Sequence, residues 1–296
     1  MNLVDTHAHL DFADDIDGWL DRAKADGVGK IFCVGTSVDA SRKCVAIAEK
    51  YSTGDEDSGQ ARMTDGSGMQ IYATVGIHAE DGKSDIEKYG SLYRCIDTLK
   101  QIALDSGKVV GVGECGFDVK SDRDPASLKL RGASQLPEIR KFQHELFSAQ
   151  IELAAELKLP LVVHCRNAWE ETFNSISNAK YPMSNIQCRG VFHSWTGDWE
   201  AAKRALNLGF YISFSGIVTF KNAPNVQEVA RKMPIDRMLL ETDSPFLAPE
   251  PMRGATNEPK NVKIVASFIS LDSPIGPEKI VISASALPVL LASEGL

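Results

Sequence analysis

The sequence predicts an α/β fold, a (β/α)8 TIM barrel that forms a single domain over residues 1–296. Three observations support this prediction. Eight short apolar segments alternate with amphipathic helical segments, which is the pattern of a parallel sheet with crossover helices. Eight such units fit a chain of 296 residues, since these barrels typically contain about 250 residues. Histidine, aspartate and glutamate, whose side chains are common metal ligands, stand at the carboxyl ends of several apolar segments.

Strands are expected where short apolar runs are bounded by turn-forming residues. They span residues 3–7, 30–35, 70–76, 109–114, 160–164, 190–193, 210–214 and 238–243. Helices are expected between and after them, at residues 16–25, 40–50, 91–104, 137–157, 169–176, 199–208, 225–232 and 258–270. The clearest is 137–157, in which Phe142, Leu146 and Leu153 are spaced for one buried face. A doubly wound open sheet is the alternative arrangement of the same elements.

Two polar segments interrupt the alternation. Residues 53–68 are rich in Gly, Ser and Asp and join a helix to the next strand. We therefore expect a flexible insertion there, on the face of the barrel opposite the active site. Residues 119–135 follow a strand, which places them on the active-site face. Their basic side chains either contact substrate or belong to a solvated charged loop.

Composition and charge narrow the class of protein. A formal net charge of -8 argues against binding of polyanions through a broad basic surface. The six cysteines form no Cys-x-x-Cys pair, so reduced, buried thiols are expected. The first residues are acidic where a targeting peptide is basic, and no apolar run approaches the ~20 residues of a membrane span. We expect a soluble cytoplasmic or nuclear protein without a membrane partner.

Histidine and carboxylate side chains stand at the carboxyl ends of five predicted strands, where TIM barrels place their working residues. His7 and His9 are one residue apart, so they point to the same side of an extended segment. The other four are Glu114, His164, His193 and Asp243. Four of the six histidines of the chain fall at these ends. The pattern therefore predicts a metal centre.

Two metal ions explain this ligand set better than one. Four imidazoles and two carboxylates exceed the needs of one tetrahedral ion, whereas two ions about 3.5–4 Å apart can share a carboxylate. We predict that Glu114 is the shared ligand and that Asp243 is a ligand that also accepts a proton from metal-bound water. Mixed nitrogen and oxygen ligation suits Zn²⁺ or Mn²⁺ and tolerates Mg²⁺ less well, and the sequence does not select among them.

Two further side chains are candidates for substrate binding. Arg166 lies two residues beyond His164, so it can face the same cavity and neutralise a phosphate or carboxylate. An ordinary surface arginine is the alternative. His78 follows the third predicted strand, and it either binds substrate or orients a metal ligand.

A glycine motif on the fourth strand offers a competing interpretation. Gly111, Gly113 and Gly116 match the Gly-x-Gly-x-x-Gly pattern of dinucleotide-binding sites. That function requires a helix to begin at the glycines. Helical periodicity resumes only after Pro137, so we interpret the match as incidental.

Several segments together closely resemble the TatD family of metal-dependent deoxyribonucleases, within the amidohydrolase-type barrels. They are VDTHAHL (4–10), GVGECGFD (111–118), LPLVVHCRNA (159–168), VFHSWTG (191–197), LLETDSPFLAP (239–249), Arg253 and NEP (257–259). The resemblance extends from residue 1 to about residue 270. It implies two ions held by the six residues named above and hydrolysis of DNA phosphodiester bonds, often as a 3′-to-5′ exonuclease. It also implies that Arg166 and His78 lie near the phosphates.

The chain departs from the family pattern at three places. Ala79 and Glu80 stand where the family often has Pro-His, and an acidic side chain there can weaken or redirect phosphate binding. Val119 replaces a frequent tyrosine at the start of the enlarged loop. Pro288 interrupts the helix expected near the C-terminus. These departures concern substrate range and barrel closure and leave the predicted metal ligands intact.

The leading functional hypothesis is a hydrolase of DNA, acting on single strands or 3′ ends with two divalent ions, in which Glu114 and Asp243 are catalytic. The alternative is a small-molecule amidohydrolase or phosphoesterase with the same centre, which the acidic charge and Glu80 favour. A barrel that binds without catalysis is a third reading. The six filled ligand positions argue against it.

Overall fold

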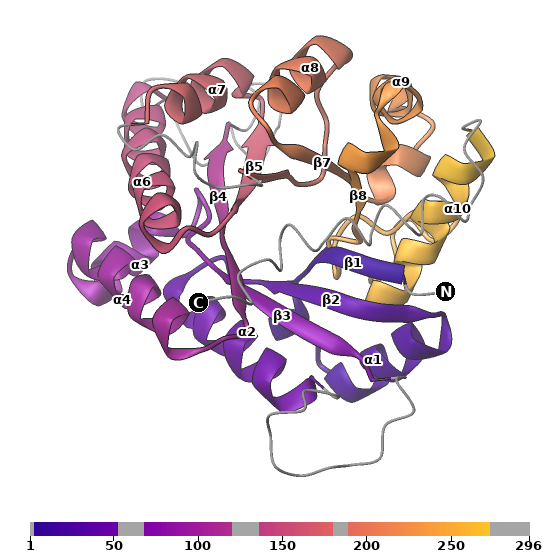
Figure 1. The fold of residues 1–296 in the computed structure, drawn as a ribbon, viewed down its shortest axis with the longest axis horizontal. Helices are drawn as coiled ribbons and strands as arrows, with labels where there is room; N and C mark the ends of the chain where they lie inside the picture. Colours follow the sequence, from indigo (N-terminus) through magenta and orange to yellow (C-terminus); the bar gives the residue numbers. More distant parts are fainter. Residues whose placement is uncertain (1–2, 53–67, 120–135, 180–188, 273–296) are drawn as a thin grey trace.

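Eight parallel strands form the wall of a nearly closed barrel, with helices around the outside (Figure 1). The computed structural model describes residues 3–52, 68–119, 136–179 and 189–272. Neighbouring strands hydrogen-bond in sequence order from β1 to β8. Their bounds are β1 Leu3–Ala8, β2 Val28–Val34, β3 Gln70–Val75, β4 Val109–Asp118, β5 Leu161–Arg166, β6 Gly190–Phe192, β7 Tyr211–Phe214 and β8 Met238–Leu240. The predicted TIM barrel is therefore confirmed.

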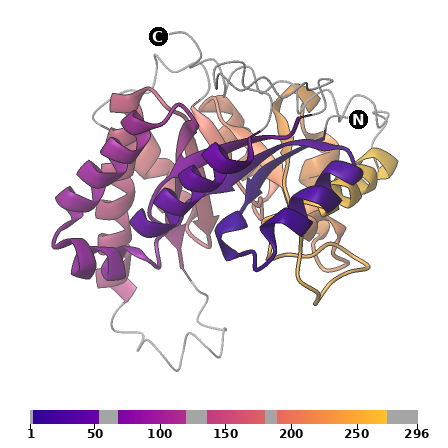
Figure 2. The same cartoon turned by 90° about the horizontal axis from the view of Figure 1, so that it is seen from below.

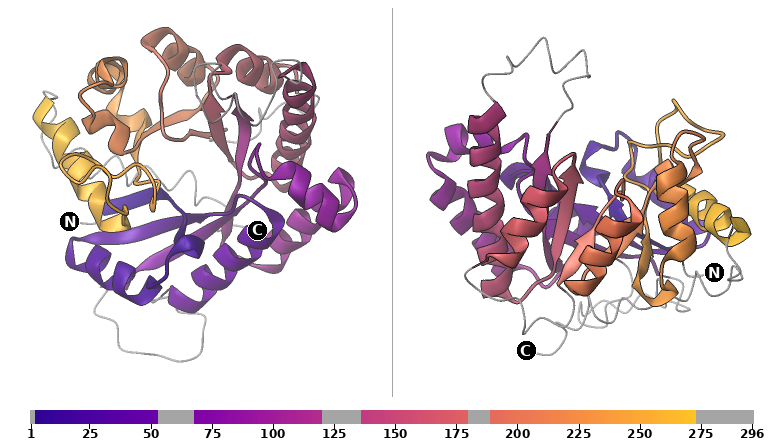
Figure 3. Two further views of the ribbon diagram at one scale, coloured as in Figure 1. Left: turned by 180° about the vertical axis from the view of Figure 1, so that it is seen from behind. Right: turned by 90° about the horizontal axis from the view of Figure 1, so that it is seen from above.

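The helices lie outside the strands, as the side view and the two further views show (Figures 2 and 3). The α-helices in the described residues are α1 Ile16–Ala25, α2 Val38–Tyr51, α3 Gly82–Tyr89, α4 Leu92–Asp105, α6 Leu136–Leu157, α7 Trp169–Ser177, α8 Trp199–Asn207, α9 Pro224–Lys232 and α10 Val262–Asp272. Short 3-10 helices are η1 Leu10–Phe12, η5 Gly216–Thr219, η6 Ile235–Arg237 and η7 Pro259–Asn261. Within the described ranges, no helix is both long and apolar enough to cross a membrane.

Local capping explains where several helices begin. A side-chain oxygen of the residue before the helix accepts a hydrogen bond from a backbone N–H of the first turn, which has no partner inside the helix. Asp15 accepts from Gly18 at 2.9 Å before α1, and Ser91 accepts from Arg94 at 3.2 Å before α4. Ser37 caps α2 in the same way. These caps fix the ends of the crossover helices relative to the strands.

Apolar side chains pack on both sides of the barrel wall. The larger core cluster joins strand residues to the surrounding helices. Two smaller clusters contain strand residues only, so they fill the inside of the barrel. With Tyr211 packed against them, they provide one side chain from each strand: Val4, Phe32, Tyr72, Val110, Val162, Val191, Tyr211 and Leu239. This layer blocks the barrel interior below the polar end of the strands.

The barrel closes through the segment that follows β8. Ala8 at the end of β1 forms a parallel bridge with Ser244. Backbone hydrogen bonds of 2.8 Å run from Asp243 N–H to the His7 carbonyl and from His9 N–H to the Ser244 carbonyl. The buried Asp5 carboxyl group adds acceptors for the Thr242 N–H at 2.8 Å and the Thr242 hydroxyl at 2.6 Å. Closure therefore depends on residues next to three of the predicted metal ligands.

Some predicted boundaries differ from the observed ones. Strand β4 continues beyond Glu114 to Asp118, because residues 115–118 pair with β5. Strand β8 ends at Leu240, before the predicted end at Asp243, whose φ of 58° is incompatible with an extended strand. Helix α3 was not predicted. Its sequence, GKSDIEKY, has too few apolar residues to show helical periodicity.

Other predictions have mixed outcomes. The glycines at 111, 113 and 116 lie within β4, and no helix begins there, which confirms that the dinucleotide motif is incidental. The described cysteines, at 33, 44, 95, 115 and 165, are buried free thiols, as expected. The predicted insertion at 53–68, the loop at 119–135 and the segment around Pro288 lie outside the described residues, except for Gly68 and Val119 at their edges.

Replacing Asp5 with alanine is expected to weaken barrel closure. The change leaves the buried Thr242 N–H without its acceptor and removes the shortest hydrogen bond of the Thr242 hydroxyl, so we expect the free energy of unfolding to fall by about 2–4 kcal/mol. Urea denaturation in the presence of a chelator measures this without a contribution from bound metal. The cap variant Ser91→Ala is the control, with an expected loss of about 1 kcal/mol. An equal loss in both variants would contradict the assigned role.

Candidate metal centre

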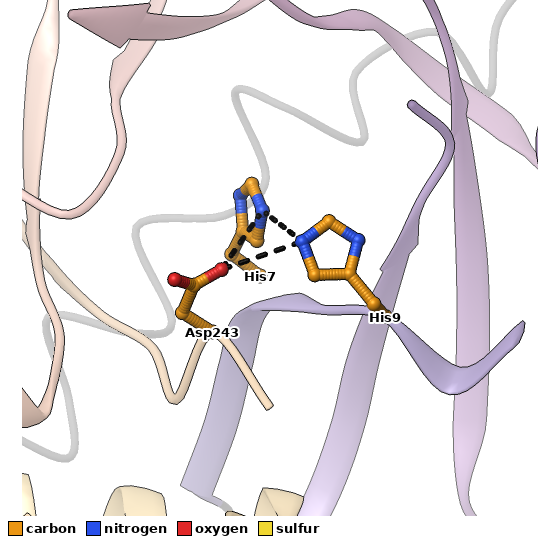
Figure 4. A group of neighbouring side chains, drawn as sticks. All are labelled: His7, His9 and Asp243. Carbon is orange, nitrogen blue, oxygen red and sulfur yellow. Dashed lines mark hydrogen bonds and ion pairs between the residues drawn. The ribbon is translucent and has the colours of Figure 1, made fainter. Parts of the chain in front are cut away.

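His7, His9 and Asp243 converge at one end of the barrel (Figure 4). His7 belongs to β1 and His9 follows it, whereas Asp243 lies three residues after the end of β8. The two Nε2 atoms are 3.3 Å apart. Asp243 Oδ1 lies 3.3 Å from His9 Nε2 and 3.6 Å from His7 Nε2. All three residues are buried, and their nitrogen and oxygen atoms are suitable ligands for one divalent cation.

Glu114 lies between these histidines and a second pair. Its Oε2 atom is 3.4 Å from His7 Nε2 and 3.6 Å from His9 Nε2. Its Oε1 atom is 2.8 Å from His164 Nδ1 and 2.8 Å from His193 Nε2. Each carboxylate oxygen therefore faces a different pair of imidazoles, which is the arrangement expected of a carboxylate shared by two ions.

Strand bulges turn Glu114 and His7 towards the barrel interior. In β4, Val112 pairs with Leu161 of β5 and Cys115 pairs with Val163. Three residues of β4 therefore advance beside two residues of β5, so β4 contains one extra residue. Val112 and Cys115 both pack in the outer core, although residues three apart in a regular strand face opposite sides. The extra residue lets Glu114 face inward. A similar three-residue step in β1, ending at Ala8, contains His7. The pairing between strands thus decides the direction of both ligands.

Asp118 is a site residue that the sequence-based prediction missed. It ends β4, and its Oδ2 atom is 3.2 Å from His164 Nε2 and 3.8 Å from Arg166 Nη1. The ligand-type atoms of His78, Asp118 and His164 all lie within 4.8 Å of one another. A signal existed, because positions 114, 116 and 118 of an extended strand face one side. It was overlooked because the predicted strand ended at Glu114.

The second ring nitrogens of His9 and His193 each face a protein oxygen. His9 Nδ1 donates to the Val34 carbonyl at 3.1 Å, which leaves Nε2 available to a metal. His193 Nδ1 lies 3.4 Å from the carboxylate of Glu241. Glu241 is fully buried and accepts a hydrogen bond from the Ser194 N–H at 2.8 Å. It also escaped the sequence-based prediction, although it stands only two residues before the last predicted ligand.

Burial and neighbouring charges set the protonation of the metal-free site. Burial opposes charging of His9, but the hydrogen bond to Asp243 and the charge of Glu114 outweigh it and raise the pKa of His9 to about 9. Burial also disfavours the charged form of Glu114, yet the neighbouring His193 and other imidazoles hold its pKa well below its usual range. Burial lowers the pKa of His78 to about 4, so His78 is neutral at pH 7.

The donor set fits divalent cations. Buried carboxylates require compensating charge, and here that charge comes from imidazoles that are themselves metal ligands in their neutral form. Imidazole nitrogens with carboxylate oxygens suit zinc, manganese, cobalt or iron. His7 Nδ1 and Glu241 Oε2 are buried and have no hydrogen-bond partner among the described residues. The hydrogen bonds within the cluster thus leave some of its buried polar atoms without a partner.

A pocket of about 610 Å³ lies over this cluster. Arg166 and His78 line it, together with five of the six predicted ligands: His9, Glu114, His164, His193 and Asp243. The Arg166 side chain is 49% exposed, and His78 Nε2 is 3.8 Å from Glu114 Oε1. Glu80, which departs from the family pattern, lines the same pocket. Contact of Arg166 and His78 with a phosphate stays a prediction.

Comparison with known proteins agrees with this geometry. The family model described as TatD related DNase matches residues 4–284. This chain belongs to the TatD family. All six predicted ligands, as well as Asp118 and Glu241, lie within the matched residues.

Individual relatives of the TatD family match over most of their length. The uncharacterized metal-dependent hydrolase YabD of Bacillus subtilis is 33% identical over 271 residues, which cover 90% of each chain. The uncharacterized metal-dependent hydrolase YcfH of Escherichia coli is 33% identical over 288 residues, 95% of this chain and 91% of the relative. The crystal structure of YjjV, a TatD homologue from E. coli, matches with a TM-score of 0.78 at 25% identity over 97% of both chains. The protein is a TatD-family metal-dependent hydrolase.

The affinity of this TatD-family site for metal is expected to rise with pH. Because the pKa of His9 is about 9 in the metal-free protein, its imidazole carries a proton at pH 7 that a cation must displace. The apparent association constant for Zn²⁺ should therefore increase about tenfold per pH unit for each proton released, up to pH 9. Isothermal titration in buffers of different ionisation enthalpy measures the released protons.

The variant His144→Ala serves as control, because His144 is exposed on α6. It should bind the metal with the same pH dependence as the native protein. An affinity that stays constant between pH 6 and 8 would contradict the assigned protonation of the site.

Proposed function

We propose that this chain is a metal-dependent deoxyribonuclease that hydrolyses phosphodiester bonds of single-stranded DNA from the 3′ end. The observation that carries the proposal is the position of Glu114, whose two oxygens face different histidine pairs beneath a pocket that contains Arg166. Two cations suit the charge that develops on phosphorus oxygens during an in-line displacement, and the arginine suits a neighbouring phosphate of the strand. The family description, TatD related DNase, supports the same reaction.

Two ion sites are proposed around the shared carboxylate. The first would use His7, His9, Asp243 and Glu114 Oε2, and the second Glu114 Oε1, His164 and His193. When bound, the ions would acidify a water molecule and polarise the phosphoryl oxygens. The predominance of imidazole nitrogen favours Zn²⁺ or Mn²⁺ over Mg²⁺.

Protein side chains supply the proton transfer and the substrate contacts. Burial disfavours ionisation of Asp243, but the hydrogen bond from His9 and the nearby imidazole charges keep its pKa below the usual value. Asp243 is therefore ionised at neutral pH and able to accept a proton from the attacking water. Arg166 pairs with phosphate oxygens. His78, which is neutral, contributes a hydrogen bond instead of a charge.

A small-molecule phosphoesterase or amidohydrolase is the second candidate. Glu80 and Asp81 both line the pocket, and their negative charges oppose the approach of a polyanionic strand. Ionic strength separates the candidates, because binding of a nucleic acid weakens steeply with salt whereas binding of a neutral small molecule hardly changes.

The substitution Asp243→Asn is expected to lower kcat on a single-stranded oligodeoxynucleotide by about 100-fold or more, because the amide does not accept the proton. Turnover with added Mn²⁺ and bound metal per chain are measured together. The control is Asp236→Asn, an identical change at an exposed position of η6. Near-native turnover of Asp243→Asn would exclude Asp243 as the proton acceptor.

End-labelled oligonucleotides test the direction of hydrolysis. With the native protein and Mn²⁺, a 3′ label should be released as a mononucleotide before the 5′-labelled strand has shortened by more than a few residues. Bound metal without hydrolysis of any oligonucleotide would exclude the deoxyribonuclease and favour the small-molecule hydrolase.

Replacement of Arg166 by methionine tests the phosphate contact. Loss of one charge-assisted contact should raise KM for an oligonucleotide about tenfold. It should also make the slope of log KM against log salt concentration shallower by about 0.7. The control is Arg204→Met on the outer helix α8, where the arginine contacts Glu170. Equal salt dependence in Arg166→Met and the native protein would contradict the assigned contact.

A further inference from the structure

Two phenylalanine rings are exposed at the mouth of the metal pocket. In the described part of the chain, five large apolar side chains are exposed: Phe12, Tyr93, Leu104, Phe246 and Leu271. Phe12 is 54% and Phe246 is 50% exposed, and both line the pocket. Their ring centroids are 6.0 Å apart with an interplanar angle of 68°. The two rings therefore form one continuous apolar surface at the site.

The rings are attached to the segments that carry metal ligands. Phe12 ends η1, three residues after His9, and Phe246 lies three residues after Asp243. Each ring centroid is 5.9 Å from the centroid of the His9 ring. A group that rests on either phenylalanine is thus next to the proposed first ion site.

Hydrogen bonds hold the backbone of both residues. The Phe12 N–H donates to the His9 carbonyl at 3.2 Å, and the Phe246 N–H donates to the Asp243 carbonyl at 2.8 Å. The Asn257 side chain donates to the Phe246 carbonyl at 2.7 Å. The exposed rings consequently belong to a fixed surface and not to a loose segment. A preformed apolar surface of this kind binds a partner at a small entropic cost.

The pocket has an apolar side and a charged side. Phe12 and Phe246 lie beside His9, with Ile217 and Leu247 also in the lining. Arg166 is in contact instead with Asp118, the neighbour of His164 at the second proposed ion site. The proposed ion sites lie between these two sides. A ligand that fits both has a planar apolar part on one side of a phosphate and further negative charge on the other.

We propose that Phe12 and Phe246 bind the nucleobase of the nucleotide that is cleaved from the strand. This inference rests on the proposed nuclease function and adds to it the part of the substrate that is recognised. A base stacks on the exposed face of one ring while its edge meets the other, as the edge-to-face geometry of the pair permits. The sugar then spans the short distance to the phosphate over the metal ligands, and Arg166 faces the next phosphate of the strand.

Stacking predicts a particular selectivity. Every base has a π-face, so the site accepts all four bases and distinguishes poorly among them. It does distinguish a nucleotide that has a base from one that lacks it. A phosphoesterase for simple sugar phosphates gains nothing from the two rings.

The test compares two oligodeoxynucleotides that differ only at the 3′ end, one with a thymidine and one with a tetrahydrofuran abasic residue. The native protein with Mn²⁺ should have a KM about tenfold lower for the thymidine end. In Phe12→Leu and Phe246→Leu this ratio should fall towards one, because the KM for the thymidine end rises towards that for the abasic end. Phe246→Trp, which keeps a stacking face, should retain the ratio.

The matched control is Tyr93→Leu, which removes an exposed aromatic ring from α4 and should retain the native ratio. An unchanged ratio in both leucine variants, with DNA hydrolysis intact, would overturn the base site alone. Absence of oligonucleotide hydrolysis by the native protein would overturn the proposed function and the base site together. Thermal denaturation is measured for each leucine variant to check that it is folded.

Discussion

The contact of one buried carboxylate with four imidazoles organises the functional end of this barrel. Glu114 faces His7 and His9 with one oxygen and His164 and His193 with the other. A carboxylate in this environment needs positive charge nearby, because burial disfavours its ionised form. Protonated histidines provide that charge in the metal-free protein, and divalent cations are suited to replace it. The close grouping of strand ends in a barrel makes this convergence possible.

Barrel closure and ligand placement depend on the same short segments. The end of β1 and the segment after β8 are joined by backbone hydrogen bonds at His7, His9 and Asp243, and by the acceptors that Asp5 offers to Thr242. A substitution that displaces one of these metal-binding residues would therefore also disturb the hydrogen bonds that close the barrel. The same linkage implies that bound metal stabilises the closed barrel, since an ion that binds only the folded site lowers its free energy.

The proposed anionic substrate has to bind to an acidic protein. A formal charge of -8 leaves no general attraction for DNA. In the proposed function, DNA is instead held by groups in the pocket. These are the ions at the ligand cluster, Arg166 on one side and the two phenylalanine rings on the other. Glu80 and Asp81 at the mouth then disfavour long contacts with a duplex backbone. The proposed substrate is accordingly a single strand that enters by its end and is held at the terminal nucleotide.

The sequence by itself determined the eight alternating strands and helices, favoured their closure into a barrel, and indicated six residues that meet at one end of it. Apolar periodicity is a local property of the chain, and the parallel alternation of strands and helices brings strand ends together. The tertiary structure alone decided which further residues join them. Asp118 and Glu241 enter the site, and Glu114 faces inward, because of the register between neighbouring strands and the turn after β8. Register depends on pairing between segments far apart in sequence, and a local pattern does not record it.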